Sequence, residues 1–183
     1  MTTSSSSTWR IVLQVFLWVV FAGLCAEAGG ILINAAYWLI DKPESSTILW
    51  DQARLDDLFL KDRGYFMVIC FIMLLIAVLK AILFWNVLRL SSNKDISIQQ
   101  PFHPRVIKFI QVAAFLALAI GFFCQMGMKY SDHLVENNIK MPAIQHLNFD
   151  GSEAWMLMGV SLFVIAYVFK QGIRIQSENE LTI

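Results

Sequence analysis

The chain has 183 residues, of which 57% are hydrophobic and 15% are charged, and its formal net charge at pH 7 is zero. A soluble domain carries about 25% charged residues, so this composition excludes an ordinary soluble domain and is typical of an integral membrane protein. The absence of a basic excess also argues against direct binding of nucleic acid. The three cysteines (Cys25, Cys70 and Cys124) all lie in apolar segments, which is not the pattern of a disulfide framework.

The first predicted element is an apolar run from residue 11 to about residue 33, which stays largely apolar to Ile40. Two interpretations fit its centre, "AGLCAEAGG". Ala26-Glu27-Ala28 could be the cleavage site of a signal peptide, or the stretch could be the middle of a transmembrane helix that carries one carboxylate. A signal peptide is followed by polar mature sequence, whereas here "GGILINAAYWLI" continues the apolar run. We therefore expect an uncleaved first helix.

Three further apolar runs follow, at about residues 65–88, 106–128 and 155–173. A transmembrane helix needs about 20 mostly apolar residues. Only helices and closed barrels cross lipid, because every backbone polar group must be satisfied there, and these runs lack strand alternation. The sequence therefore predicts an all-α membrane protein, a single domain over residues 1–183 with four transmembrane helices in a bundle.

Four spans place both termini on one side of the membrane. The second loop is short and carries Arg89, Lys94 and Arg105 close to the spans, which is where the positive-inside rule operates. We therefore predict a multi-pass protein with both termini in the cytoplasm.

Three polar side chains inside the spans are candidate functional residues: Glu27, Lys80 and Gln125. At 1.5 Å per residue, Glu27 lies about 24 Å and Gln125 about 28 Å above the inner ends of their apolar runs, whereas Lys80 lies only about 12 Å above its own. These depths predict that Gln125 is the partner of Glu27. They also predict that Lys80 lies too far from Glu27 for an ion pair and extends toward the inner head groups.

Small and polar residues repeat at helical spacing on two faces, Gly23, Glu27, Gly30 and Asn34 in the first span and Ala117, Gly121 and Gln125 in the third. Small residues at this spacing let two helices approach closely. We therefore expect the first and third spans to pack together, with Glu27 directed into the bundle. Glu27 is then either a protonatable or ligand-binding group, or a neutral group that holds the bundle together by hydrogen bonds.

Motifs of the common enzyme classes are absent: there is no phosphate-binding loop, no H-E-x-x-H and no G-x-S-x-G. In the third loop His133 and Glu136 share a helical face and His146 follows, but we interpret them as solvated residues and expect no metal and no cofactor. The first loop contains six apolar residues: Ile48, Leu49, Trp50, Leu55, Leu58 and Phe59. They could lie on the membrane surface or cover the end of the bundle. We favour the alternative that they belong to a short structured linker.

The tail, "FKQGIRIQSENELTI", and the second loop, "ISIQQPFHPRVIKFI", carry the most specific pattern. They resemble the YoaS-like bacterial membrane proteins of unknown function (domain of unknown function family 2975), which also have four spans. The matching tail residues include Gly172, Glu178, Asn179, Glu180 and Leu181. The resemblance implies a location in a bacterial inner membrane, and it implies no catalytic residues. It does imply that relatives are often encoded beside a small helix-turn-helix regulator.

We therefore expect an uncharacterised membrane protein that is not an enzyme. The favoured function is that of a membrane partner that sequesters or tunes a cytosolic transcription regulator through the second loop and the tail. The alternative is a small transporter or permeability factor that uses Glu27 and Gln125. Apart from the lipid bilayer and such a regulator, the sequence identifies no partner, and it leaves the oligomeric state open.

Overall fold

The computed structural model of the chain describes residues 3–40, 55–92 and 104–180. These residues form five α-helices and one 3₁₀ turn, and the described part contains no strand: α1 Thr3–Ile40, α2 Asp56–Lys61, α3 Arg63–Ser92, α4 Pro104–Glu136, η2 Ile144–Leu147 and α5 Ser152–Glu180. The all-α prediction is confirmed.

Four of the helices are long and apolar enough to cross a membrane, with mean hydropathy of 2.1, 3.0, 2.2 and 1.7 in their most apolar windows. The candidate spans are Ile11–Ile40, Arg63–Ser92, Arg105–Glu136 and Ser152–Ile175. Each of the four predicted spans lies within one of these helices, and every helix extends beyond its apolar core. The chain is therefore a multi-pass membrane protein.

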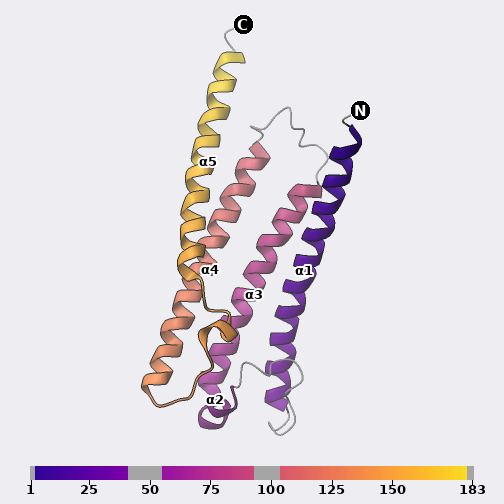
Figure 1. Cartoon of the computed structure of the whole chain (residues 1–183). Helices are drawn as coiled ribbons and strands as arrows, with labels where there is room; N and C mark the ends of the chain where they lie inside the picture. Colours follow the sequence, from indigo (N-terminus) through magenta and orange to yellow (C-terminus); the bar gives the residue numbers. More distant parts are fainter. Residues whose placement is uncertain (1–2, 41–54, 93–103, 181–183) are drawn as a thin grey trace.

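The long helices lie in the order α1, α3, α4, α5 across the molecule, so that each contacts its neighbour in the row (Figure 1). Both chain ends lie at one end of the bundle along the helix axes, and α2 lies at the opposite end. The expected pairing of the first and third spans, which are α1 and α4, is wrong because α3 lies between them. The order follows the chain, since the short connections favour packing between consecutive helices.

The small-residue faces explain this difference. In α1, a Cβ atom added at Gly23 or Gly30 would meet nothing within 4 Å, so this face makes no close helix contact. In α4, a Cβ at Gly121 would lie 2.8 Å from Met156 Cγ, and in α5 a Cβ at Gly159 would lie 2.6 Å from Leu118 Cγ. The glycines therefore bring α4 close to α5, as small residues do in membrane helix pairs.

Aromatic and aliphatic side chains hold α1 against α3 instead. Trp18 and Phe21 contact Trp85, with ring centroids 6.4 and 5.4 Å apart respectively. At the opposite end Trp38 stacks on Phe66 at 5.7 Å, and Ile31 is fully buried between them. Dispersion contacts and aromatic geometry, rather than close backbone approach, thus join these two helices.

The first loop contributes α2, which covers the end of the bundle remote from the termini. Leu55, Leu58 and Phe59 are all buried, and the Phe59 ring meets Phe66 and Trp38 edge-on at 5.2 and 5.4 Å. The linker is therefore structured and also caps the core. The other apolar residues of this loop, Ile48, Leu49 and Trp50, lie outside the described residues.

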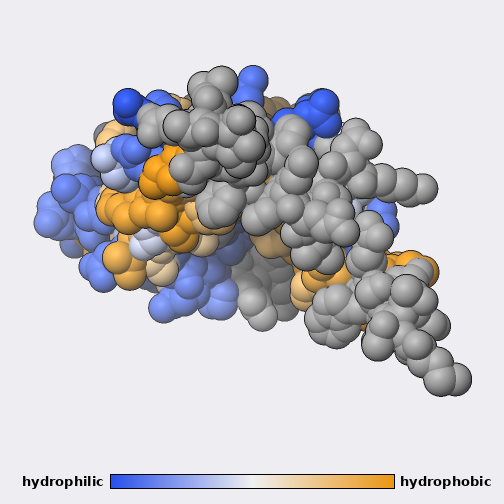
Figure 2. Space-filling model, turned by 90° about the horizontal axis from the view of Figure 1, so that it is seen from above, coloured by the Kyte–Doolittle hydropathy of each residue, from blue (hydrophilic) through white to orange (hydrophobic). Residues whose placement is uncertain are grey.

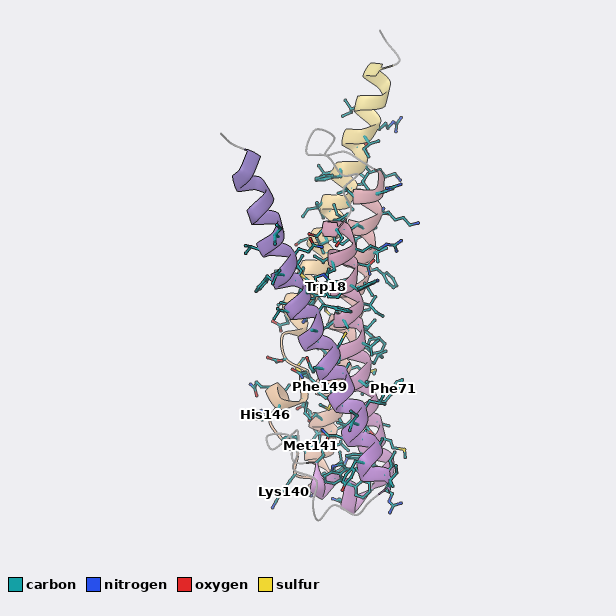
Figure 3. All side chains as sticks on the ribbon, turned by 90° about the vertical axis from the view of Figure 1, so that its right-hand side faces the viewer. Trp18, Phe71, Lys140, Met141, His146 and Phe149 are labelled. Atoms are coloured by element: carbon teal, nitrogen blue, oxygen red, sulfur yellow. The ribbon has the colours of Figure 1, made fainter. Side chains whose placement is uncertain are left out.

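The third loop folds back along the bundle, although the sequence had indicated an outer polar loop. Leu147 and Phe149 are fully buried in the core. Figure 3 shows Lys140, Met141, His146 and Phe149 at successive levels along the bundle, with Lys140 nearest the α2 end. The ring of Phe149 lies 2.9 Å from the position that a Cβ atom of Gly127 would occupy. The missing side chain of Gly127 thus makes room for this aromatic ring.

Because of this return, α5 begins far from the end of α4. The carbonyl of Ser152, the first residue of α5, lies 3.0 Å from the Cβ position of Gly121. Gly121 is fifteen residues before Glu136, which corresponds to about 22 Å of helix. Residues 137–151 therefore cover that distance inside the fold, and the polar side chains of this segment enter the bundle with them.

The cytoplasmic placement of the termini remains a prediction, which reporter fusions test. A fusion after Gly64 should report the outer side, whereas a fusion after Ile183 should report the cytoplasm, because the basic second loop is expected to stay inside. A fusion after Ser92, at the same end of the bundle as both termini, serves as a control and should agree with Ile183. Agreement between Gly64 and Ile183 would contradict the predicted topology.

Candidate functional site

The relative height of α1 and α3 is fixed by a hydrogen bond near the end of the bundle that carries both termini, in which Gln14 Nε2 donates to Ser92 Oγ at 3.2 Å. Glu27 lies thirteen residues beyond Gln14, and Lys80 twelve residues before Ser92. These separations correspond to about 20 and 18 Å of helix, so Glu27 and Lys80 lie at nearly the same depth. The predicted depth difference between them is wrong, because the apolar runs did not mark equivalent levels on the two helices.

The carboxylate of Glu27 is bound by the returning loop. Asn148 Nδ2 donates a hydrogen bond to Glu27 Oε1 at 2.6 Å. The predicted partner, Gln125, has a different contact: its Oε1 accepts a hydrogen bond from Ser152 Oγ at 3.1 Å. The expected pairing of Glu27 with Gln125 is therefore corrected to two neighbouring pairs, Glu27 with Asn148 and Gln125 with Ser152.

Asn148 is held in place from both sides. It follows η2 in the left-handed conformation, with φ 58° and ψ 28°, a backbone state that asparagine adopts more readily than most residues. Its amide reaches α1, while its carbonyl accepts a contact from Cys124 Sγ of α4 at 3.8 Å. The residue thus links the first and third spans, which do not pack against each other directly.

Two charged residues influence the Cys124 thiol, which contacts Asn148. The charges of Lys80, from α3, and Asp150, from the returning loop, both interact electrostatically with the Cys124 thiol. The resulting group, which we call the intramembrane polar cluster, consists of Glu27, Lys80, Cys124, Gln125, Asn148 and Ser152. It draws residues from all four long helices and from the loop. Glu27 and Gln125 thus belong to the two hydrogen-bonded pairs of the cluster, and Lys80 lies at nearly the same depth as Glu27.

The cluster combines hydrogen-bond donors and acceptors in a setting where polar groups are costly. A charged residue on a lipid-facing helix centre costs about 2.5–3.5 kcal/mol or more, and Glu27 avoids part of this cost by accepting the Asn148 hydrogen bond. Ser152 is buried, whereas Glu27 and Gln125 are partly exposed. Such an arrangement can hold a proton or a small polar ligand, or it can fix the loop against the helices.

A further polar group lies on the Glu27 face of α1. Asn34 is seven residues beyond Glu27, which is about two helical turns along the same face. Its Nδ2 atom is buried and has no hydrogen-bond partner within the described ranges. Buried polar groups normally have partners, so this donor marks the region between the cluster and the Ile40 end of α1 as a second place of functional interest.

Sequence reasoning missed Asn148 and Ser152. Both lie in a polar connection between two apolar runs, and nothing in its composition singles them out. The available signal was the pattern Leu147-Asn148-Phe149, in which two apolar residues flank an asparagine shortly before Gly151. An asparagine between buried apolar neighbours indicates a structured turn rather than a solvated loop.

The third-loop candidates for metal binding are dispersed. His133 and Glu136 are exposed at the end of α4, and the His133 ring lies 3.3 Å from the side-chain amide of Asn137. His146 is exposed farther along. Within the residues that the structure describes, no group of three or more potential ligands could hold a metal ion. That the protein carries no metal remains a prediction.

The tail residues continue α5 beyond the rest of the bundle. Gly159 lies beside Ala114, whose carbonyl is 3.0 Å from the Gly159 Cβ position. Ala114 is ten residues after Pro104, whereas Glu180 is twenty-one residues after Gly159. Helix α5 therefore extends about 16 Å past the first residue of α4, and Figure 1 shows its end projecting beyond the other helices.

Among the predicted docking residues, Gly172 is partly buried. Glu178, Asn179 and Glu180 form the last turn of α5, and Leu181 lies outside the described residues. A helical course through Glu180 means that these acidic residues do not fold back onto the bundle.

A row of four membrane-spanning helices with a polar loop packed into its centre defines a class of small all-α, multi-pass membrane proteins. Within that class the chain belongs to the family described as Protein of unknown function (DUF2975), whose model matches residues 41–183. This confirms the family resemblance of the second loop and the tail. The matched region includes every member of the polar cluster except Glu27. Searches of curated proteins and of solved structures found no match.

Proposed function

We propose that this protein, in the inner membrane of a bacterium, is a regulatory partner that binds a cytosolic helix-turn-helix transcription regulator through the projecting end of α5. The observation that carries the proposal is the course of α5. This one helix starts in the intramembrane polar cluster at Ser152 and ends at Glu180, about 16 Å beyond the start of α4. The proposed role needs no cofactor and no enzymatic step.

The packing of α5 supports a regulated position for its tail. Helix α5 packs against α4 and presents mostly exposed apolar side chains elsewhere. Its first residue is hydrogen-bonded to Gln125, next to the Asn148–Glu27 pair. Packed helices can shift by sliding past each other, so a change within the cluster would move the projecting end relative to the bundle.

The chemistry of the tail suits a basic protein surface. Ile175 is 60% exposed, and Ile173 lies two residues before it. Glu178 and Glu180 follow on the last turn. A DNA-binding domain is basic because it must meet phosphates, so an acidic helix end can compete with DNA for it. Tethering both tail and regulator at the membrane raises this competition through effective concentration.

Deletion of Ser177–Ile183 tests the proposal. The truncated protein should still insert into the membrane, because its four spans are intact, but capture of the regulator from native membranes should be abolished. The double variant Glu178→Lys and Glu180→Lys should have the same effect while retaining the full length. A five-residue deletion at the other chain end, Thr2 to Ser6, serves as the control. Retention of the same regulator by the truncated protein, or capture of none by the full chain, would refute tail docking.

A second candidate function, transport or permeation of a small solute or proton, is favoured by the polar groups along one face of α1. Within the described part of the chain, Glu27 accepts a hydrogen bond from Asn148, and the buried amide nitrogen of Asn34 has no hydrogen-bond partner. Flux into proteoliposomes that depends on the Glu27 carboxylate, and is lost in Glu27→Gln, would support this function. Tail deletion should leave such flux unchanged, which distinguishes it from regulator binding.

A further inference from the structure

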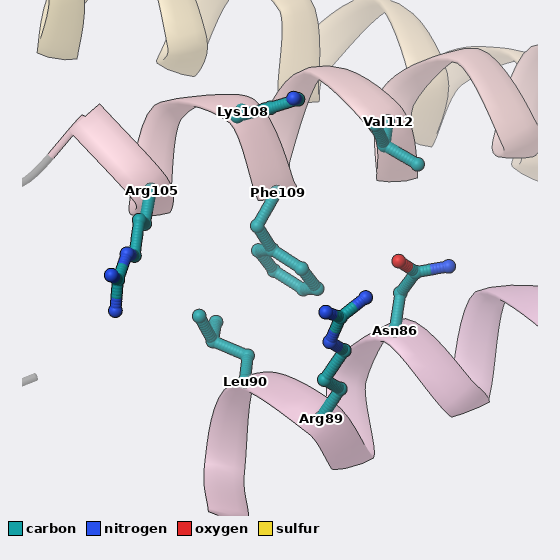
Figure 4. A pocket seen from close by; sticks show the side chains of 7 residues that line it. All are labelled: Asn86, Arg89, Leu90, Arg105, Lys108, Phe109 and Val112. Carbon is teal, nitrogen blue, oxygen red and sulfur yellow. The ribbon is translucent and has the colours of Figure 1, made fainter. Parts of the chain in front are cut away.

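A cavity of about 530 Å³ opens between α3 and α4 at the end of the bundle that carries both termini. Among the described residues, its lining contains three basic residues and no acidic one: Asn86, Arg89, Leu90, Arg105, Lys108, Phe109 and Val112. Figure 4 shows that Phe109 points from α4 toward α3, with Leu90 and Arg89 on either side of it. The cavity therefore combines basic side chains with the apolar side chains of Leu90, Phe109 and Val112.

The basic residues lie where the backbone also favours an anion. Arg105 and Lys108 belong to the first turns of α4, and a helix N-terminus carries a partial positive charge. An anion bound at this position would interact favourably with both the helix dipole and the neighbouring basic side chains. Lys108 lies along α4 in Figure 4, and its flexible four-carbon stem lets the ammonium swing into the cavity.

Apolar surface continues from the cavity toward the middle of the membrane. Ile82 is four residues before Asn86 and seven before Arg89, so it shares their face of α3, and it is 43% exposed. On α4, Phe115 is three residues after Val112 and seven after Lys108, and it is 69% exposed. An apolar track about 10 Å long therefore begins where the basic residues end.

We infer that this cavity binds the phosphate group of an anionic phospholipid, with Arg89 and Lys108 as its principal ligands and an acyl chain along Ile82 and Phe115. Guanidinium and ammonium groups are the side chains that bind phosphate most strongly, and basic pockets between membrane helices bind anionic head groups. A free phosphate would satisfy the same two cations but would leave the apolar track unused. Seen from this end, hydrophilic and hydrophobic residues lie side by side on the coloured part of the surface (Figure 2).

The test uses the full chain in nanodiscs that contain phosphatidylcholine with or without phosphatidylglycerol. The measured quantity is the preference of the protein for spin-labelled phosphatidylglycerol over spin-labelled phosphatidylcholine. The wild-type protein should prefer the anionic lipid. Removing two cations with Arg89→Gln and Lys108→Gln should reduce this preference about thirtyfold. The control variant Lys129→Gln and Lys140→Gln removes two exposed cations at the opposite end of the bundle and should keep the preference.

The remaining outcomes decide against the proposal. If the wild-type protein shows no preference, or if both double variants lose it equally, the cavity is not a specific lipid site. A second arm adds inorganic phosphate to discs of phosphatidylcholine alone and measures its binding by calorimetry. Binding that requires Arg89 and Lys108, in a protein without lipid preference, would assign the cavity to free phosphate instead.

Discussion

Replacement of Gly121 by leucine is expected to separate α5 from α4 and to lower the thermal stability of the protein in detergent. A Cβ atom at this position would lie 3.0 Å from two backbone atoms of α5, Met156 N and Ser152 O. Backbone atoms cannot rotate away as the end of a side chain can, so the two helices must move apart. Overpacking costs about 1–3 kcal/mol, and a whole leucine at a backbone contact falls at the upper end. The midpoint of unfolding should fall by about 10 °C.

Gly23→Leu is the matched control, because it makes the same chemical change inside another span. A Cβ atom at Gly23 would meet nothing within 4 Å. Its midpoint should change little, since substitutions away from close contacts stay within about 0.5 kcal/mol. Thermal unfolding followed by circular dichroism measures both variants. A larger loss for Gly23→Leu than for Gly121→Leu would mean that the small-residue face of α1 is the true packing face.

These two glycines show how far the sequence determined the fold. Hydrophobic run length identified four helices, because the cost of an unsatisfied backbone in lipid leaves almost no other structure. The same sequence could not identify which helices are neighbours. Gly23 and Gly121 occur in equivalent small-residue patterns, yet only Gly121 contacts another helix closely. Small size permits close approach but carries no information about the partner.

The position of Lys80 shows a second limit. Its depth was counted from the end of the apolar run, at Leu88, whereas α3 continues to Ser92 and is aligned with α1 by Gln14. An error of one turn at a helix end shifts a depth by about 5 Å, and errors at two helices add. The helix register depends on specific side-chain contacts, and hydropathy does not report these.

The returning loop shows the third limit. Polar residues of a connection look solvated in the sequence, and hydropathy cannot show that Leu147 and Phe149 carry Asn148 into the core between them. Only the space left by Gly127 makes this packing sterically feasible. The partner of Glu27 therefore came from a segment 121 residues away in the chain, while the candidate itself, an acid inside a span, was visible from composition alone.

The Glu27–Asn148 hydrogen bond should be measurable as a coupling energy. Glu27→Leu removes the acceptor and leaves the Asn148 amide without its partner, which should destabilise the protein by about 1 kcal/mol, at the upper part of the range for polar contacts in membranes. Glu27→Gln keeps a side-chain oxygen that can accept the same hydrogen bond, so its stability should remain close to that of the wild-type protein.

Asn148→Gly is the complementary change, because Asn148 has a φ of 58° and glycine adopts this conformation without strain. The substitution removes the amide group and preserves the turn. Asn138 has the same φ of 58° but is exposed and does not contact Glu27, so Asn138→Gly controls for the added backbone freedom. Any loss of stability that both glycine variants share arises from the greater conformational freedom of the unfolded chain and not from the missing hydrogen bond.

The decisive measurement is the double variant Glu27→Leu with Asn148→Gly. Once one partner is gone, removal of the other should cost little, so the double variant should be about 1 kcal/mol more stable than the sum of the two single changes implies. Reversible unfolding in mixed micelles, with Asn138→Gly as the reference for the glycine effect, gives the four free energies of the cycle. Strictly additive losses would show that Glu27 and Asn148 do not interact, and α1 would then be held at this depth by its contacts with α3 alone.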